Sequence, residues 1–206
     1  STNKVTVEKF YVENASHLGL RLLAGANGLK RTIKEPTVNR PGLALSGFTK
    51  YFASKRMQAL GAAAVTYLKT LTVDERAKRY AEICRHRIPC FVFSRNLKPD
   101  KQFVKAAEKV DIPVFRCPLI TMKFISRATL ALEDLFAPRG QVQGSMVDIL
   151  GVGVIIKGES GIGKSECTLA LVERGYSLVS DDVTKVKLVD GREVIGTSAS
   201  ITRNHM

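Results

Sequence analysis

The sequence predicts an α/β fold in two domains, residues 1–136 and residues 137–206. Three observations lead to this prediction. Short apolar segments alternate with segments of helical spacing in the first part, a pattern typical of a parallel or mixed sheet. A glycine-rich motif in the second part lies between a strand-like and a helix-like segment. Pro138 and Gly140 interrupt the chain between the two parts.

The composition indicates an ordinary globular protein. The 206 residues are 45% hydrophobic and 25% charged, which excludes a disordered chain. No apolar stretch reaches the length of a membrane span, and the N-terminus lacks a signal-peptide core, so we expect a cytoplasmic protein without a membrane partner. The four cysteines have no C-x-x-C spacing and no neighbouring histidine cluster, which favours reduced thiols over disulfides or zinc.

The elements of the first domain follow from its apolar runs and turn signals. We expect strands at residues 5–11, 31–34, 42–45, 64–68, 90–94 and 114–117. We expect helices at residues 15–22, 55–60, 72–85, 101–109 and 122–136. Asp74 and Glu75 support one of these helices, because acidic side chains in a first turn interact favourably with the helix dipole. No catalytic constellation is evident here, so we expect this domain to bind or regulate.

The net charge of +13 is unevenly distributed. The last 67 residues carry 7 basic and 8 acidic side chains, which leaves 25 basic and 11 acidic ones in the first 139. The whole excess therefore lies in the N-terminal part. It indicates an acidic partner, either protein or nucleic acid, or else a solvated basic surface.

The second domain begins with a strand-rich segment, residues 146–156, interrupted by Gly151 and Gly153. A helix at residues 166–174 and a strand at residues 178–180 should follow, and then a hairpin over residues 185–195. Asp190 and Gly191 form a favoured type I′ turn pair for that hairpin. About 65 residues are few for a P-loop fold, so we expect a further C-terminal part beyond this sequence.

The glycine-rich motif is the strongest chemical signal. It fits G-x-x-x-x-G-K-[ST], the phosphate-binding P-loop, and follows an apolar run that ends at Ile156. We expect its backbone N–H groups and the next helix N-terminus to hold phosphate oxygens. Lys164 should bridge the outer phosphates and Ser165 should bind Mg²⁺. The expected nucleotide-binding residues are Gly158, Glu159, Ser160, Gly161, Ile162, Gly163, Lys164 and Ser165. Cys167, just inside the helix, should be the most reactive thiol.

Two adjacent aspartates form a second candidate element. Asp181 and Asp182 follow the apolar strand-like run Ser177 to Ser180. A strand that follows a P-loop helix ends beside the phosphate-binding loop. One carboxylate could therefore face the terminal phosphate and the other a metal ion, because adjacent residues of an extended chain point to opposite sides. An exposed acidic turn, or an ordinary metal-binding aspartate, is the alternative.

These residues strongly resemble the bacterial HPr kinase/phosphorylase family. The resemblance is most specific in residues 144–166 and 171–182, where the P-loop, the helix at Glu166 and the paired aspartates occur together. It continues in the N-terminal half, and spans nearly the whole chain. The similar N-terminal segments are residues 39–48, 59–61, 88–95 and 125–127.

The resemblance implies an ATP-dependent protein serine kinase, and a phosphorylase, acting in the regulation of carbohydrate metabolism. Its substrate would be HPr, the phosphocarrier of the bacterial sugar phosphotransferase system. Asp181 would take the serine proton, Lys164 would contact the phosphates, and Ser165 would bind Mg²⁺. Asp182 stays a candidate Mg²⁺ ligand, or a partner of one, from its position beside Asp181. ATP would be the nucleotide ligand in the forward direction, and pyrophosphate would be the phosphate ligand in the reverse direction. The family further implies a Mur-ligase-like N-terminal domain, a C-terminal P-loop kinase domain and a hexamer.

The sequence departs from the family pattern in two places. The family normally has a histidine, in a His-Gly run, where this chain has Gln143. Glutamine cannot gain a proton near neutrality, so phosphorolysis is either weakened or unaffected. The family also continues after a pair such as His205-Met206 with a Glu-Ile/Val-Arg-Gly signature that supplies a metal-binding glutamate. Without that part we expect poor nucleotide binding and no catalysis.

Two other functions remain open from the sequence. The basic N-terminal part would suit a nucleotide-gated regulatory or nucleic-acid-binding protein, although no stripe of aromatic and basic residues supports nucleic acid. A P-loop kinase of a small molecule is the other, although such a substrate needs no docking domain of this size.

Overall fold

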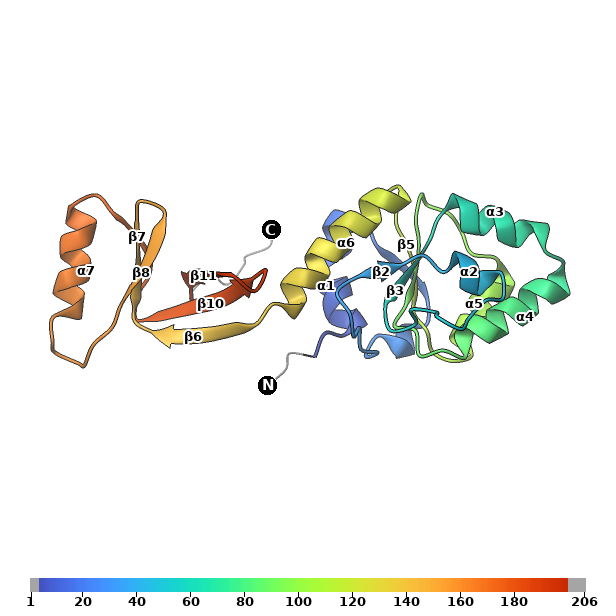
Figure 1. Ribbon diagram of the computed structural model, residues 1–206, viewed down its shortest axis with the longest axis horizontal. Coiled ribbons are helices and arrows are strands. Elements are labelled where there is room, and N and C mark those ends of the chain that lie inside the picture. Colours follow the sequence, from blue (N-terminus) through green and yellow to red (C-terminus); the bar gives the residue numbers. More distant parts are fainter. Residues whose placement is uncertain (1–3, 200–206) are drawn as a thin grey trace. The chain divides into compact units, whose positions relative to one another are not determined.

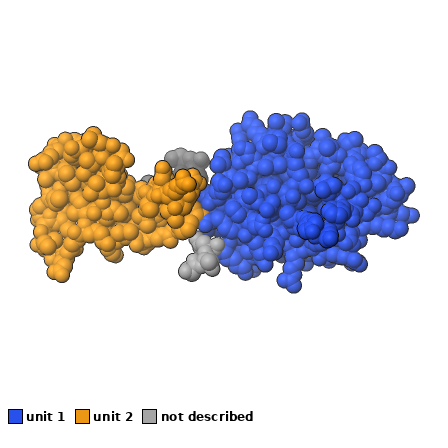
Figure 2. Space-filling view, viewed as in Figure 1, with its two compact units in different colours: residues 1–136 blue, residues 137–206 orange. Residues whose placement is uncertain are grey.

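A computed structural model describes residues 4–199 of the chain. The chain divides into two compact units, Ser1–Phe136 and Ala137–Met206, which are drawn in different colours in Figure 2. The α/β class predicted from the sequence is confirmed, because helices pack on a mostly parallel sheet in the first unit.

The first unit is built on a five-stranded sheet with the order β1-β5-β4-β3-β2. Strands β2 to β5 are parallel to their neighbours, whereas β1 runs antiparallel to β5 at one edge. The strands are β1 (Arg21–Ala24), β2 (Val38–Asn39), β3 (Met57–Leu60), β4 (Phe91–Phe93) and β5 (Val114–Arg116).

Helices cover both faces of this sheet (Figure 1). One core cluster joins α1 and α6 to one face, and the other joins α2 to α5 to the opposite face. Alternation along β4 explains both clusters, since Val92 belongs to the first and Phe91 and Phe93 to the second. The helices are α1 (Val7–Leu18), η1 (Ala26–Gly28), α2 (Gly42–Leu45), α3 (Ala62–Thr70), α4 (Val73–Cys84), α5 (Lys101–Glu108) and α6 (Thr121–Phe136).

The strand expected at residues 5–11 is wrong, because α1 begins there. Thr6 is its N-cap, and the Thr6 hydroxyl accepts a hydrogen bond from the Lys9 N–H at 3.1 Å. Val7, Phe10 and Leu18 are buried on one face of this helix. The expected helix at residues 15–22 covers only the end of α1, since the chain leaves the helix at Gly19 and enters β1.

Tertiary burial also reverses the elements expected around residue 60. Residues 55–60 were expected to be helical, but all four residues of β3 are buried in the sheet. Residues 64–68 were expected to be a strand, but they lie in α3, whose alanines favour a helix. Residues 42–45 form α2 rather than a strand, and residues 31–34 contribute only an isolated bridge between Thr32 and Thr6.

The second half of this unit agrees with the sequence. The predicted elements at residues 72–85, 90–94, 101–109, 114–117 and 122–136 are confirmed as α4, β4, α5, β5 and α6. Helix α4 begins with a capping box, in which Thr72 and Glu75 exchange side-chain-to-backbone hydrogen bonds. These hydrogen bonds lower the pKa of Glu75, the backbone N–H of Thr72 having the largest effect.

The described residues of the second unit, 137–199, form two antiparallel three-stranded sheets and one helix, α7 (Lys164–Glu173). One sheet has the order β11-β10-β6 and the other β8-β7-β9. The strands are β6 (Arg139–Gln143), β7 (Ser145–Ile149), β8 (Val152–Ile156), β9 (Ser177–Ser180), β10 (Val183–Val189) and β11 (Glu193–Ser198). The Met146 side chain of β7 lies against Gly153 of the same sheet and Gly196 of β11 in the other sheet, and a Cβ at either glycine would collide with it.

The predicted hairpin is confirmed as β10 and β11. Asp190 and Gly191 have φ angles of 51° and 64°, as both central residues of a type I′ turn require. The N–H of Arg192 closes the turn on the Val189 carbonyl at 3.1 Å. Among residues 4–199, no helix combines the length and the apolar character needed to cross a membrane.

Candidate active site

The glycine-rich loop connects β8 to α7, which is the arrangement expected for a phosphate-binding loop. Gly161 and Gly163 have φ angles of 80° and 103°, a conformation that glycine adopts without strain. Gly163 is the N-cap of α7 and supplies no side-chain hydrogen bond to it. The N–H groups of the first helical turn therefore stay available to an anion.

Lys164 is folded back onto this loop. Its Nζ donates a hydrogen bond to the Glu159 carbonyl at 2.6 Å, while its own carbonyl accepts one from the Thr168 hydroxyl at 2.9 Å. The ammonium group therefore lies across the mouth of the loop, where it can contact phosphate oxygens once it releases the carbonyl. Residues 158–162 are exposed to solvent.

The strand order brings Asp181 to the same end of the sheet as the glycine-rich loop. Strand β7 pairs antiparallel with both β8 and β9, and Met146 of β7 is opposite Ile155 on one side and Ser180 on the other. The carboxyl ends of β8 and β9 therefore lie at the same end of the sheet, one on each side of β7. Two strand spacings of about 4.8 Å put the backbones of Ile155 and Ser180 roughly 10 Å apart.

Two chain segments pass from one sheet to the other at this end of the strands. One connects β6 to β7, and the other connects β9 to β10. Gly144 links β6 to β7, and its N–H donates to the Asp182 carbonyl at 2.7 Å. A side chain at Gly144 would collide with the Ile156 carbonyl, since a Cβ would lie 2.6 Å from that oxygen, and the φ of 147° also favours glycine. The crossing therefore requires glycine before Ser145.

Ser145 contacts both aspartates and was not singled out in the sequence. Its hydroxyl donates to Asp181 Oδ1 at 2.8 Å and accepts from the Asp182 N–H at 3.1 Å. No sequence motif predicts these contacts, because they depend on the register between β7 and β9.

Gln143 ends β6 and pairs with Val183, the residue after the two aspartates. The structure therefore brings Gln143 close to them along the backbone. Its exposed side chain forms no hydrogen bond with either aspartate in the described part of the chain.

Oxygen ligands of the kind that Mg²⁺ prefers are present at the start of α7 and at the paired aspartates. Ser165 is exposed in the first turn of α7, and the Asp182 carboxylate is exposed beside Asp181. Within residues 4–199, no group of three or more histidine, cysteine or acidic side chains gathers as a metal site would. A hydroxyl and a carboxylate are donor types that Mg²⁺ accepts when substrate phosphates supply its other ligands.

The four cysteines are free thiols of two kinds. Cys167 in α7 is exposed, as its predicted reactivity requires. Burial raises the pKa of Cys84 to about 11 and raises those of Cys90 and Cys117 as well. The three buried thiols belong to the core of the first unit.

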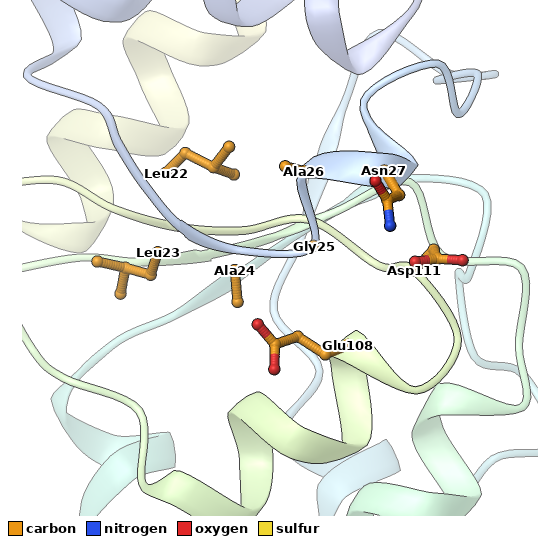
Figure 3. A pocket seen from close by; sticks show the side chains of 8 residues that line it. All are labelled: Leu22, Leu23, Ala24, Gly25, Ala26, Asn27, Glu108 and Asp111. Atoms are coloured by element: carbon orange, nitrogen blue, oxygen red, sulfur yellow. The ribbon is translucent and has the colours of Figure 1, made fainter.

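Two of the open cavities in the first unit lie beside its sheet. One, of about 430 Å³, lies beside β1; Figure 3 shows that Glu108 of α5 reaches toward Ala24 there and that Asp111 lies near Asn27. Its acidic lining does not suit phosphate. The other, of about 450 Å³, lies at the carboxyl ends of the parallel strands, and Arg40 and Arg95 contribute to its lining.

Comparison with protein-family models covers almost the entire chain. Residues 5–132 match the model described as HPr Serine kinase N terminus, and residues 134–206 match HPr Serine kinase C-terminal domain. This chain belongs to the HPr serine kinase family. Comparison with individual members of the HPr serine kinase family supports the same assignment.

The HPr kinase/phosphorylase of Listeria monocytogenes serotype 4a is 40% identical over 200 residues, which are 97% of this chain and 63% of that protein. The proteins of the same name from Brevibacillus brevis and Clostridium botulinum are 36% and 41% identical, over 91% and 88% of this chain and 60% and 59% of theirs. The chain thus spans about three fifths of the length of these HPr serine kinase relatives.

One solved structure, of the CBS and DRTGG domains of the regulatory region of Clostridium perfringens pyrophosphatase with diadenosine tetraphosphate, has a TM-score of 0.43 and 13% identity. It covers 64% of this chain and 51% of that chain, and this likeness is too low to bear on function.

Proposed function

We propose that this protein is an ATP-dependent serine kinase whose substrate is the phosphocarrier protein HPr. Membership of the family suggests the substrate, and one observation supports the chemistry. Asp181 follows β9 and the glycine-rich loop follows β8, and both strands end on the same side of the β8-β7-β9 sheet, which supports a carboxylate near the terminal phosphate of a bound nucleotide.

The proposed roles are those that the family resemblance implies, and this geometry supports them. The N–H groups of residues 158–165 bind the phosphates, and Lys164 exchanges the Glu159 carbonyl for phosphate oxygens. Ser165 and Asp182 are the proposed Mg²⁺ ligands; bound there, the ion would neutralise phosphate charge. Asp181 accepts the proton of the substrate serine.

The forward reaction balances as follows. The serine oxygen attacks the γ-phosphorus in line and forms a new P–O bond, while the bond to the bridging oxygen breaks and ADP leaves. The serine proton moves to Asp181. A serine hydroxyl is a weak nucleophile, so alignment and charge stabilisation contribute more than the strength of the base.

The proposed reverse reaction uses the same residues, with inorganic phosphate in place of ADP. A phosphate oxygen attacks the phosphorus of phosphoserine and forms the P–O–P bond of pyrophosphate, while the bond to the serine oxygen breaks and Asp181 gives its proton to that oxygen. We propose that Gln143, which cannot carry a proton, makes this direction slower than a histidine would.

The remaining features of the proposal concern the whole protein. The first unit is proposed to be a Mur-ligase-like docking or regulatory domain, and the second is proposed to belong to a P-loop kinase domain. We further propose a hexamer that acts in the cytoplasm. These features rest on the family alone.

The decisive experiment measures transfer of labelled phosphate from ATP to purified HPr by the full-length protein with Mg²⁺. We expect Asp181→Asn to lower the rate about 100-fold while ATP binding stays within about twofold. Asp190→Asn, at the hairpin turn, is the matched control, because asparagine tolerates positive φ, and it should keep the wild-type rate. Unlabelled HPr, or an active Asp181→Asn variant, would refute the proposal.

A second measurement addresses Gln143. With phosphorylated HPr and inorganic phosphate, Gln143→His should raise pyrophosphate release by about tenfold at neutral pH, because histidine can hold a proton there. The forward rate serves as the internal control. An unchanged ratio of reverse to forward rates would show that glutamine replaces histidine without consequence.

A further inference from the structure

The Ser145 hydroxyl occupies a position that no sequence motif predicts. It accepts a hydrogen bond from the Asp182 N–H at 3.1 Å and lies 2.8 Å from Asp181 Oδ1. A hydroxyl has one proton and two lone pairs. Because the amide occupies a lone pair, the proton is free to point at the carboxylate. Ser145 is 9% exposed, so a displaced hydroxyl would not readily regain water.

The backbone that Ser145 supports is strained. Asp182 has a φ of 59°, and the Val183 N–H donates to the Asp181 carbonyl at 2.7 Å, which closes a tight three-residue turn. A non-glycine residue keeps such a conformation only where its surroundings enforce it. Here the Asp182 carbonyl is held by the Gly144 N–H at 2.7 Å and the Asp182 N–H by Ser145.

The second oxygen of Asp181 is left available. Oδ2 makes no hydrogen bond to any residue of the described chain, and Asp181 has no ion pair with a described lysine or arginine. A neutral hydroxyl therefore orients the carboxylate without neutralising its charge. A basic partner would have competed with the substrate proton for that charge.

We propose that Ser145 is a positioning residue for Asp181, fixing Oδ1 so that Oδ2 faces the incoming serine hydroxyl. This inference rests on the proposed function. It adds that the orientation of the base comes from β7, through a side chain that never touches the substrate. Removing the hydroxyl should therefore slow the chemical step and leave nucleotide binding intact.

The test compares Ser145→Thr with Ser145→Val in the full-length protein, because threonine and valine have nearly the same shape and differ in the hydroxyl. We expect Ser145→Val to lower kcat for phosphate transfer to HPr by about tenfold to 100-fold, since a small misplacement of a catalytic group has effects of that size. The KM for ATP should change by less than about twofold. Ser145→Thr should recover kcat to within about threefold of wild type.

Ser180→Ala is the matched control. Ser180 is a buried serine next to Asp181, but its hydroxyl bonds to Thr184 Oγ1 at 2.5 Å rather than to either aspartate. Its kcat should stay within about threefold of wild type. Ser145→Ala replaces Ser145→Val in the comparison if thermal melting shows that valine prevents folding.

A double-mutant comparison of Ser145 and Asp181 provides an independent measurement. In an Asp181→Asn background, Ser145→Val should not lower the residual rate further, because the group that Ser145 positions is already lost. Equal kcat values for the threonine and valine variants, or additive effects in the double variant, would overturn the role of Ser145. Inactive wild-type protein would instead contradict the proposed kinase function, so the two failures are distinguishable.

Discussion

Asp182 and its neighbours show how single residues shape the candidate site. The φ of 59° at Asp182 turns the chain sharply from β9 into β10, and glycine at position 144 lets the neighbouring segment pass within hydrogen-bonding distance. Asp181 thereby lies at the start of a fixed turn rather than in a free loop. The sequence identifies the aspartates by type and position, but the contact with Ser145 depends on a strand register that no local pattern encodes.

Cysteine chemistry offers a prediction at the residue scale. Iodoacetamide at pH 8 should label the native protein once, at Cys167, because the thiolate is the reactive form. The raised pKa of about 11 keeps Cys84 protonated at that pH, and its labelling should rise only as the pH approaches 11. Peptide mass spectrometry gives the site. Four labels in urea are the control, and early native labelling of Cys90 or Cys117 would contradict the burial of these thiols.

At the scale of elements, Asp100 connects two helices of the first unit. Its Oδ1 accepts the Phe103 N–H at 2.8 Å as the N-cap of α5, and its Oδ2 accepts the Tyr80 hydroxyl of α4 at 2.5 Å. Arg76 Nη1 lies 3.4 Å from the same carboxylate. Burial and this hydrogen bond raise the pKa of Tyr80, so the phenol stays protonated at physiological pH.

We expect Asp100→Ala to lower the free energy of unfolding by about 2 kcal/mol, because it removes a helix cap and leaves the buried Tyr80 hydroxyl without a partner. Urea denaturation followed by circular dichroism measures the change. Asp100→Asn should recover most of it, since an amide oxygen can also cap. Asp74→Ala, at an exposed first-turn position of α4, should cost less than about 0.5 kcal/mol. Equal losses at both sites would argue against the proposed link.

The elements themselves differ in how far local sequence decides them. Helix α4 agrees with the prediction because its helical spacing and first-turn acids are local signals, to which the structure adds a capping box. Strand β3 was predicted as a helix, because Met57 to Leu60 is too short for its period to be decisive and becomes a strand by pairing with β2 and β4. Residues 5–11, where α1 begins, are likewise too short for their apolar period to distinguish a helix from a strand.

At the scale of the whole molecule, the two units differ in how much apolar surface they bury. Both core clusters lie in the first unit, whereas Val147 is the one buried hydrophobic residue in the described part of the second. Several apolar side chains of the second unit are exposed, including Leu150, Ile162 and Leu169. A helix such as α7, which buries only Thr168, receives little stabilisation from packing in this chain.

Limited proteolysis should separate the units. With trypsin, we expect the second unit to be cut first and a resistant fragment ending close to Phe136 to accumulate, because local opening is easiest where few apolar contacts must break. Intact mass spectrometry identifies the fragment. In the full-length protein, added Mg²⁺ and ATP should slow cleavage near residues 158–165. Simultaneous loss of both units would contradict the expected difference in stability.

The sequence alone determined the family and the α/β class, and it singled out the glycine-rich loop and the pair of aspartates as the candidate site. These depend on residue types at fixed spacing or on alternating apolar segments, which are local properties of the chain. His205 and Met206, after which the family signature was expected, lie outside the described residues. Only the tertiary structure decided which residues support Asp181, because strand order and register bring Gly144, Ser145 and Asp182 together from positions almost forty residues apart.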